Sequence, residues 1–158
     1  MLNQKEKESD IIEKLASNEE LVAKLYKAYA DAFPNLRGFW DSLVTEEIKH
    51  ALWIRSLGAK TGTSQIFVDE GRFNIIAIQT FMKYMDKELA RLNEQKIPLI
   101  EALSIAFYIE QSLIENKYFE VFKTDSAELQ HTLKRLHDDT LAHRNKTKEE
   151  LEKYKKSQ

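Results

Sequence analysis

The sequence contains no cysteine, and only four glycines and two prolines stand among its 158 residues. Without thiols, this chain cannot form disulfides, use thiol catalysis, or bind iron–sulfur clusters and cysteine-ligated zinc. Scarce glycine and proline, together with 42% hydrophobic and 32% charged residues, argue against a turn-rich β fold and favour an all-α fold. Any metal bound by this chain would take oxygen and nitrogen ligands.

The sequence also lacks a charge excess and a long apolar run. Its 24 lysines and arginines nearly balance 26 aspartates and glutamates, which gives a formal net charge of -2. Such a balance creates no long-range field that would attract nucleic acid, so we expect no nucleic-acid partner. No run approaches the roughly 18 apolar residues of a membrane span, and residues 1–10 lack the apolar core of a signal peptide. We therefore expect a cytoplasmic protein without a membrane partner.

The length of the chain fits one domain with a full hydrophobic core. We expect residues 1–10 to form a flexible N-terminus and residues 11–158 to form a single helical bundle. Apolar periodicity between the glycines and prolines predicts five helices. Their expected ranges are residues 11–33, 39–57, 73–92, 99–122 and 127–154. Residues 61–68 are assigned to a loop because a lone strand there has no obvious partner, and the third helix is expected to cross between two antiparallel pairs.

The second predicted helix places a carboxylate and an imidazole among apolar residues. At about 100° of rotation per residue, Glu47 and His50 fall on the same face as Trp40, Leu43 and Ile54. Burying an unpaired carboxylate is costly, so each inward polar group needs a partner. A bound cation is a common partner that satisfies both groups.

Three other helices also carry polar residues on their apolar faces. These are Glu19 on the first helix, Glu110 on the fourth, and His143 on the fifth with Asp139 about 40° away. Converging carboxylates without cations would raise one another's pKa and weaken folding, whereas two divalent ions would offset them. Carboxylate and imidazole ligands suit iron or manganese, with zinc as a further option. Glu19, Glu47, His50, Glu110, Asp139 and His143 are therefore the candidate metal ligands, with two iron ions as the expected cofactor.

Each candidate also has an ordinary structural explanation that the sequence leaves open. The spacing of Glu47 and His50 is common on helices, and Glu19 could complement the helix macrodipole if its helix began nearby. His143 could be a core histidine that is hydrogen-bonded to a tyrosine. Glu110 could pair with a cation, for which the candidates are Lys83, Arg91 and Lys117.

Four segments share their spacing with a known family. They are Glu19-x-x-Val-x-x-Leu-Tyr26, Phe-Trp-x-x-Leu-x-x-Glu-Glu47-x-x-His50-Ala, Glu101-Ala-Leu-x-x-Ala-x-x-x-Glu110, and a late helix that ends in His143. Together they resemble the rubrerythrin-like branch of the ferritin-like superfamily, over about residues 19–143. The resemblance implies a ferritin-like four-helix bundle with an additional crossover helix around a di-iron or di-manganese centre. It also implies oxidase or peroxide-reducing chemistry.

The resemblance assigns five ligands and leaves two positions that differ from the family. The corresponding ligands are Glu19, Glu47, His50, Glu110 and His143. Three residues before His143 the family usually has glutamate, whereas this sequence has Thr140, with Asp139 beside it. Leu113 stands where rubrerythrins proper carry an additional glutamate. The cysteine-rich electron-transfer module is also missing, so the resemblance implies an external electron-donor protein.

The preferred hypothesis is a dinuclear metal protein with Glu47 and Glu110 as bridging ligands. If active, it would be a peroxidase-type or oxidase-type oxidoreductase, with Tyr26 supplying or relaying a proton. One alternative is a structural or interaction bundle whose inner acids are paired with lysine, arginine or tyrosine. Another is a metal-storage or metal-sensing protein without turnover. A homodimer formed through apolar residues such as Phe67, Phe119 and Phe122 also remains open.

Overall fold

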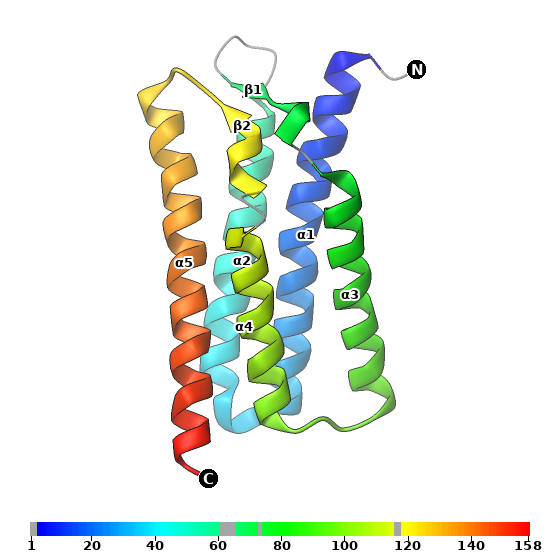
Figure 1. Cartoon of the computed structure of the whole chain (residues 1–158), viewed down its shortest axis with the longest axis vertical. Coiled ribbons are helices and arrows are strands. Elements are labelled where there is room, and N and C mark those ends of the chain that lie inside the picture. Colours follow the sequence, from blue (N-terminus) through cyan, green and yellow to red (C-terminus); the bar gives the residue numbers. More distant parts are fainter. Residues whose placement is uncertain (1–2, 61–65, 73, 116–117) are drawn as a thin grey trace.

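A computed structural model describes residues 3–60, 66–72, 74–115 and 118–158, and it confirms the all-α class. The elements in chain order are α1 (Gln4–Ala32), α2 (Arg37–Gly58), β1 (Phe67–Val68), α3 (Ile75–Glu94), α4 (Leu99–Glu115), β2 (Phe122–Lys123) and α5 (Ala127–Lys156). The helices run side by side along the long axis of the molecule (Figure 1). Helix α1 packs on α2, α4 packs on α5, and α3 lies along α1.

Helix α1 begins at Gln4, seven residues before the predicted start. Asn3 caps it: the side-chain oxygen of Asn3 accepts from the amide of Glu6 at 2.9 Å, and the Asn3 amide donates to the Glu6 carboxylate at 2.7 Å. This reciprocal pair satisfies two amides that a helix start otherwise leaves without partners. Residues 4–10, predicted to belong to a flexible N-terminus, are therefore helical. The predicted boundary was placed at Ile11, where the apolar repeat begins, whereas the capping residue Asn3 lies eight residues earlier.

The hairpin between α1 and α2 forms where proline interrupts the sequence. Residues 34–36 make a single 3₁₀ turn with Pro34 in its first position, as the predicted break requires. The two helices are held together by aromatic packing, with the Trp40 ring centroid 5.8 Å from that of Tyr26 and 5.1 Å from that of Tyr29. All three rings are fully buried. This contact fixes the faces of α1 and α2 that carry the inward acids.

A short β ladder corrects two sequence predictions. Phe67–Val68, predicted as loop, pairs antiparallel with Phe122–Lys123, which was predicted to end the fourth helix. Among the described residues, α4 spans Leu99–Glu115, and residues 118–121, predicted to continue this helix, form a 3₁₀ turn instead. Because strand pairing joins segments far apart in sequence, periodicity along one segment gives no sign of it. Residues 61–65, also assigned to a loop, lie outside the described residues.

The ladder is anchored by contacts at its end. The Asp69 amide donates to the Val121 carbonyl at 2.7 Å, and the Asp69 carboxylate lies 2.6 Å from the Lys123 ammonium nitrogen. Val68 and Phe122, which face each other across the two strands, are both buried. The ladder therefore ties the connection after α2 to the connection before α5. Within the part of the chain that the structure describes, no helix combines the length and apolar character needed to cross a bilayer.

Close packing of α1 on α2 leads to a test of the fold. A Cβ atom built on Gly58 of α2 would lie 2.6 Å from Cγ2 of Ile12 on α1. Because Ile12 is β-branched and held in one rotamer in a helix, the clash cannot be relieved cheaply. We expect Gly58→Ala to lower the free energy of unfolding by about 1–3 kcal/mol in urea denaturation, against an intrinsic helix gain of about 1 kcal/mol.

Gly38 provides the matched control on the same helix. A Cβ atom built there meets no described atom within 4 Å. Gly38→Ala should therefore leave the free energy of unfolding unchanged or raise it slightly. Equal effects of the two substitutions would contradict the described packing of α1 on α2.

Candidate metal centre

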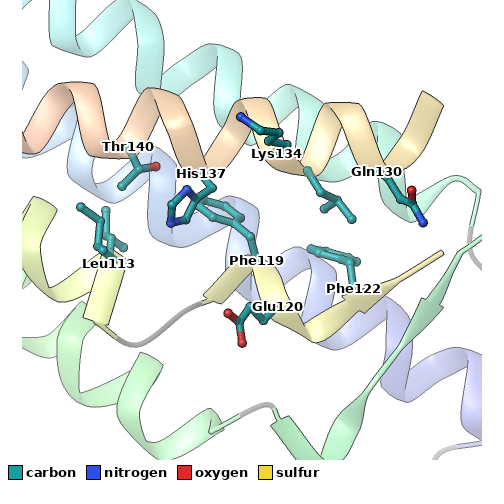
Figure 2. Close-up of a pocket in the computed structure, with 10 residues that line it drawn as sticks. Leu113, Phe119, Glu120, Phe122, Gln130, Lys134, His137 and Thr140 are labelled. Carbon is teal, nitrogen blue, oxygen red and sulfur yellow. The ribbon is translucent and has the colours of Figure 1, made fainter. Parts of the chain in front are cut away.

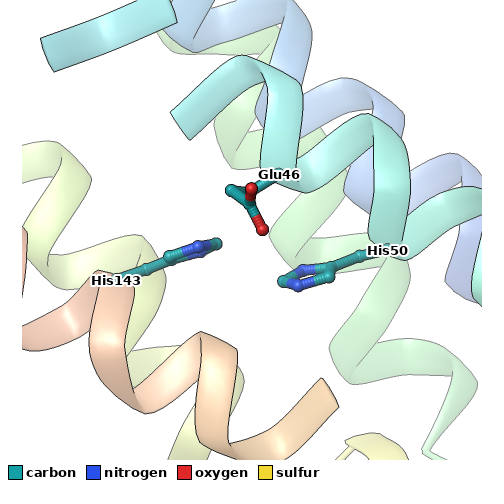
Figure 3. A group of neighbouring side chains, drawn as sticks. All are labelled: Glu46, His50 and His143. Atoms are coloured by element: carbon teal, nitrogen blue, oxygen red, sulfur yellow. The ribbon is translucent and has the colours of Figure 1, made fainter. Parts of the chain in front are cut away.

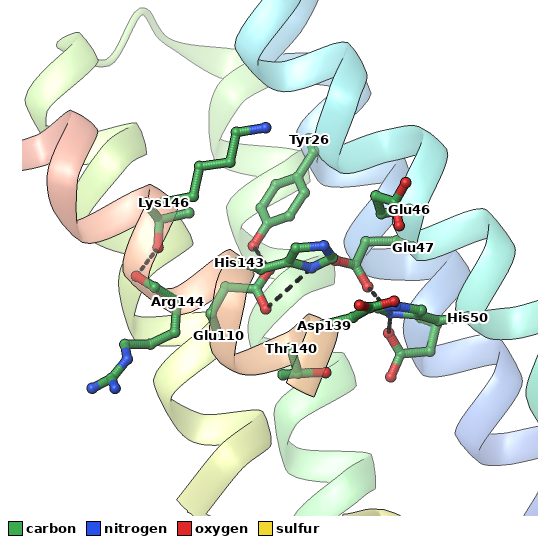
Figure 4. A network of polar contacts seen from close by, with 12 residues as sticks. Tyr26, Glu46, Glu47, His50, Glu110, Asp139, Thr140, His143, Arg144 and Lys146 are labelled. Atoms are coloured by element: carbon green, nitrogen blue, oxygen red, sulfur yellow. Dashed lines mark hydrogen bonds and ion pairs between the residues drawn. The ribbon is translucent and has the colours of Figure 1, made fainter. Parts of the chain in front are cut away.

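Four helices bring five of the predicted ligands into the interior (Figure 4). Each is at most 6% exposed. They are Glu19 from α1, Glu47 and His50 from α2, Glu110 from α4 and His143 from α5. Since helices distant in sequence contribute these side chains, the packing of the whole bundle determines the geometry of the cluster.

Glu47 lies at the centre of the cluster, between two imidazole rings. Its Oε1 is 2.7 Å from Nδ1 of His143, and its Oε2 is 3.3 Å from Nδ1 of His50. The two rings are stacked, with centroids 5.2 Å apart. Each ring also faces a second acid: Glu19 Oε2 lies 3.9 Å from His50 Nδ1, and Glu110 Oε2 lies 3.9 Å from His143 Nδ1.

The cluster divides into two groups of possible ligands that share Glu47. The first is Glu19, Glu47 and His50, and the second is Glu47, Glu110 and His143. Within each group, one ligand atom from every residue lies within 4.8 Å of the others. A carboxylate with two oxygens can serve both groups at once, so the arrangement has the form of a bridged pair of sites.

Several oxygen and nitrogen atoms in this cluster that could bind a metal have no hydrogen-bond partner. Among the described residues, the buried atoms concerned are Oε2 of Glu19, Oε1 of Glu47, Oε2 of Glu110 and Nδ1 of His143. The short Glu47–His143 contact is therefore close in distance but not aligned as a hydrogen bond. A buried polar atom without a partner costs about 1–3 kcal/mol. Oxygen and nitrogen atoms that converge in this state fit the coordination of a divalent cation.

Glu46 belongs to a third group that sequence analysis did not identify. It comes within ligand distance of His50 and His143, as Figure 3 shows. Glu46 is partly exposed, and its carboxylate pairs with the Lys49 ammonium group. Its position four residues before His50 is a same-face spacing that could have signalled it. This third group lies nearer the surface than the two buried groups.

Asp139 occupies a different place from the predicted one. Its Oδ2 lies 3.4 Å from Nε2 of His50, the ring nitrogen that faces away from Glu47, and 3.8 Å from the Lys49 ammonium nitrogen. Asp139 is absent from all three groups found among the described residues. The neighbouring Thr140 is buried, and its hydroxyl donates to the Leu136 carbonyl at 2.9 Å. Asp139 thus contacts a candidate ligand from behind, and Thr140 supplies no carboxylate.

The structure also decides the alternatives for Glu19 and Glu110. Glu19 lies in the middle of α1, so a first-turn interaction with the macrodipole does not apply. Glu110 accepts a hydrogen bond from the Tyr26 hydroxyl at 2.7 Å. Arg91, one proposed partner of Glu110, instead pairs with Glu88 and Glu101. Lys117, another proposed partner, lies outside the described residues.

The histidines follow their predicted orientations. His143 contacts Glu47 rather than a tyrosine, and it is buried. His131 and His137 are exposed, and each lies about 120° around the helix from His143. Periodicity therefore separates the one inward histidine of α5 from the two outward ones.

The metal-free cluster distributes its charge unevenly. Burial, together with the negative charge of Glu47, raises the pKa of Glu110 to about 8. The His143 imidazole and the hydrogen bond from Tyr26 lower the pKa of Glu110, but they do not outweigh these effects. Burial also raises the pKa of Glu19 well above its ordinary value, again helped by Glu47. Burial opposes ionisation of Glu47 as well, but the two imidazoles outweigh it and hold the Glu47 pKa well below its usual range. Without a cation, Glu47 is therefore the ionised member of the three acids.

Comparisons with known proteins leave the family open. No protein-family model matches this chain, and neither the curated proteins nor the solved structures give a match.

The raised pKa values predict how the metal-free protein responds to pH. Folded Glu110 keeps its proton up to about pH 8, whereas its ordinary pKa is 4.5, so the folded state binds more protons between these values. Stability must then fall as the pH rises through this window. Glu19, His50 and His143 act in the same direction because their pKa values are also raised. Thermal midpoints of chelator-treated protein between pH 5 and 8 will measure this decline.

Glu110→Gln should flatten that pH dependence, because the amide does not titrate. The control is Glu94→Gln, which removes an exposed carboxylate from α3 and should leave the dependence as it is. A thermal midpoint of the wild-type metal-free protein that rises from pH 5 to pH 8 would contradict the charge distribution described above.

Proposed function

We propose that this protein is a ferritin-like helical bundle that binds a dinuclear metal centre between α1, α2, α4 and α5. The observation that carries the proposal is the pair of buried carboxylate–imidazole groups joined by Glu47. The arrangement of the helices supports it, since the α1–α2 and α4–α5 pairs are connected through α3 as a crossover. The sequence spacing of these same residues resembles that of rubrerythrin-like proteins.

Glu47 is the bridging ligand in this proposal. Glu19 and His50 complete one site, and Glu110 and His143 complete the other. Glu110, predicted as a second bridge, belongs to only one of the two buried groups, so we assign it to one metal. Three protein ligands at each ion leave coordination positions for an exogenous molecule, as catalytic metal sites require. Iron is the preferred metal, and manganese or zinc also suit these ligands.

Asp139 acts as a positioning residue rather than a ligand. With its carboxylate 3.4 Å from Nε2 of His50, it can accept a hydrogen bond from the N–H group at that nitrogen. This contact leaves Nδ1, which faces Glu47 and Glu19, without a proton and ready to bind a cation. Carboxylates behind ligating histidines commonly fix the tautomer and ring orientation in this way.

Tyr26 is the candidate proton donor. Two iron or manganese ions in such a centre would supply the redox chemistry for reducing peroxide or dioxygen. The Tyr26 hydroxyl donates to Glu110 Oε1 at 2.7 Å and is fully buried, so a proton can pass between them without bulk water. Electrons would come from a separate donor, because residues 1–158 contain no cysteine that could hold a redox centre.

One observation favours a second candidate function, a structural bundle that binds no metal. Glu47 is already flanked by two imidazoles, while burial raises the pKa of Glu19 and brings that of Glu110 to about 8, which favours the neutral forms of these two acids. The cluster can therefore balance its charge without ions. In that case the polar cluster would specify how the helices pack rather than perform chemistry.

Metal content tests the proposed centre directly. Wild-type protein purified without chelator should contain up to two equivalents of transition metal in elemental analysis. Glu47→Ala combined with His50→Ala should reduce this to background, because it removes the bridge and a ligand. Added Fe(II) or Mn(II) should raise the thermal midpoint of the wild type only, because an ion that binds only the folded state stabilises that state.

Helix α5 offers a matched control with the same residue types and spacing. Glu128 and His131 are also three residues apart on one helix, but both are exposed. Glu128→Ala combined with His131→Ala should leave metal content unchanged. Negligible metal in the wild type, with no thermal shift on adding Fe(II), Mn(II) or Zn(II), would favour the structural candidate.

Asp139→Asn tests the positioning role. The amide accepts the His50 proton less strongly, so we expect metal affinity to fall by about 10–100-fold while the metal still binds. Competition with a chromogenic chelator measures the change. Asp138→Asn, an exposed neighbour that pairs with Lys134, serves as the control and should keep wild-type affinity. A complete loss of one metal equivalent in Asp139→Asn would instead identify Asp139 as a ligand.

A further inference from the structure

A cavity of about 380 Å³ lies between α4, α5 and the turn and strand that connect them (Figure 2). Its walls are largely apolar, formed by Ile114, Phe119, Phe122 and Leu133. This volume falls in the range of cavities that hold small molecules, which are typically about 300–1,000 Å³ and mostly apolar. The metal centre described above does not use this space.

The inner end of the cavity lies beside the candidate metal centre. Leu113 and Thr140 close this end, and both are at most 2% exposed. Leu113 follows Glu110 by three residues on α4, and Thr140 precedes His143 by three residues on α5, so each lies one helical turn from a candidate ligand. The Thr140 hydroxyl already donates to the Leu136 carbonyl. Apart from the exposed His137 imidazole, one helical turn before Thr140, this end therefore presents little polar surface and suits an apolar group.

These two positions are also the ones at which the sequence departs from the family it resembles. A glutamate at either place would put a carboxylate into the inner end of the cavity. With leucine and threonine instead, that end is uncharged. The two departures, which weaken a strict family assignment, therefore have one shared structural consequence.

The other end of the cavity carries polar and cationic groups. Lys134 and Gln130 line it and are exposed to solvent, whereas the exposed His137 lies nearer Thr140 (Figure 2). Lys134 pairs with Asp138, which lies next to His137. Glu120, on the opposite side, lies 3.5 Å from the Arg72 guanidinium, which offsets its charge. The Gln130 amide nitrogen already donates one hydrogen bond to the Thr124 carbonyl at 2.9 Å, so the mouth offers its second amide hydrogen and a lysine charge that is shared with Asp138.

We propose that this cavity binds an amphipathic carboxylate, with its apolar chain directed inward to Leu113 and Thr140 and its carboxylate at Lys134 and Gln130. The chain end would then lie one helical turn from Glu110 and His143. The cavity and its ligand class follow from the lining residues alone. Its further role as the substrate pocket of the metal centre rests on the proposed function.

Calorimetric titration of the metal-free protein with decanoate tests the binding step without requiring a metal. Decanoate should bind with one-to-one stoichiometry. Decan-1-ol, which has the same chain without the charge, should bind about tenfold more weakly, and butyrate should not bind measurably. No binding of decanoate would overturn the proposal. Equal binding of decan-1-ol would overturn the assignment of a carboxylate head.

Two variants locate the bound chain and head. Leu133→Trp fills the cavity and should abolish binding, while circular dichroism verifies that the variant is folded. Lys134→Glu reverses the charge at the mouth and should weaken decanoate binding about tenfold without affecting decan-1-ol. The matched control is Lys148→Glu, which changes another exposed lysine of α5. Lys148 also pairs with an acid four residues later, Glu152. Wild-type binding by Leu133→Trp would place the ligand elsewhere and overturn the proposal.

A second measurement separates this proposal from the metal centre. In metal-loaded protein, decanoate should change the visible or paramagnetic signature of the bound metal, because the end of the decanoate chain would lie one helical turn from the ligands Glu110 and His143. Decanoate binding in a protein that takes up no metal would support the cavity and reject the metal centre. Metal uptake without decanoate binding would reject the cavity proposal alone.

Discussion

The interior of this bundle depends on how the charge of Glu47 is balanced. Its carboxylate is 1% exposed and lies between the imidazoles of His50 and His143. A buried charge is stable only with close partners, and removing one member of a buried pair costs about 3–5 kcal/mol. Glu19 and Glu110 crowd the same space, so their ionisation is suppressed unless a cation enters. Cation binding and protonation are therefore two competing ways to stabilise the same cluster.

The fold holds this cluster together through apolar packing on either side of it. Trp40 contacts Tyr26 and Tyr29, which fixes the rotation of α1 against α2. Tyr26 in turn donates to Glu110, which links the α1–α2 pair to α4. The β ladder between Val68 and Phe122 joins the two connections at the far ends of the helix pairs. Helices from both halves of the chain must therefore be in place before the acids and imidazoles can meet.

Much of this arrangement follows from the sequence, because helical periodicity is a local property. The 3.6-residue repeat placed Glu19, Glu47, His50, Glu110 and His143 inward and His131 outward, and the structure agrees. Such periodicity reports direction from the helix axis but not height along the neighbouring helix. It therefore could not show that Asp139 meets the outer nitrogen of His50.

Other features depended on information that periodicity does not carry. The start of α1 is set by the side chain of Asn3, which lies eight residues before Ile11, where the apolar repeat used for the prediction begins. Pairing of Phe67 with Lys123 requires contact between distant segments, so neither segment alone indicates a strand. Glu46 was overlooked because it borders the apolar face rather than lying on it. The cavity beside Leu113 and Thr140 likewise appears only when α4 and α5 are packed together.

The central claim is that Glu47 bridges two metal ions, and an anomalous-scattering map tests it most directly. Crystals grown with Fe(II) or Mn(II) would be measured on both sides of the metal absorption edge. If Glu47 bridges two ions, the map will show two peaks about 3.5–4 Å apart, one beside His50 and the other beside His143, with Glu47 between them. No peak at these residues, or a single peak, would contradict a dinuclear centre.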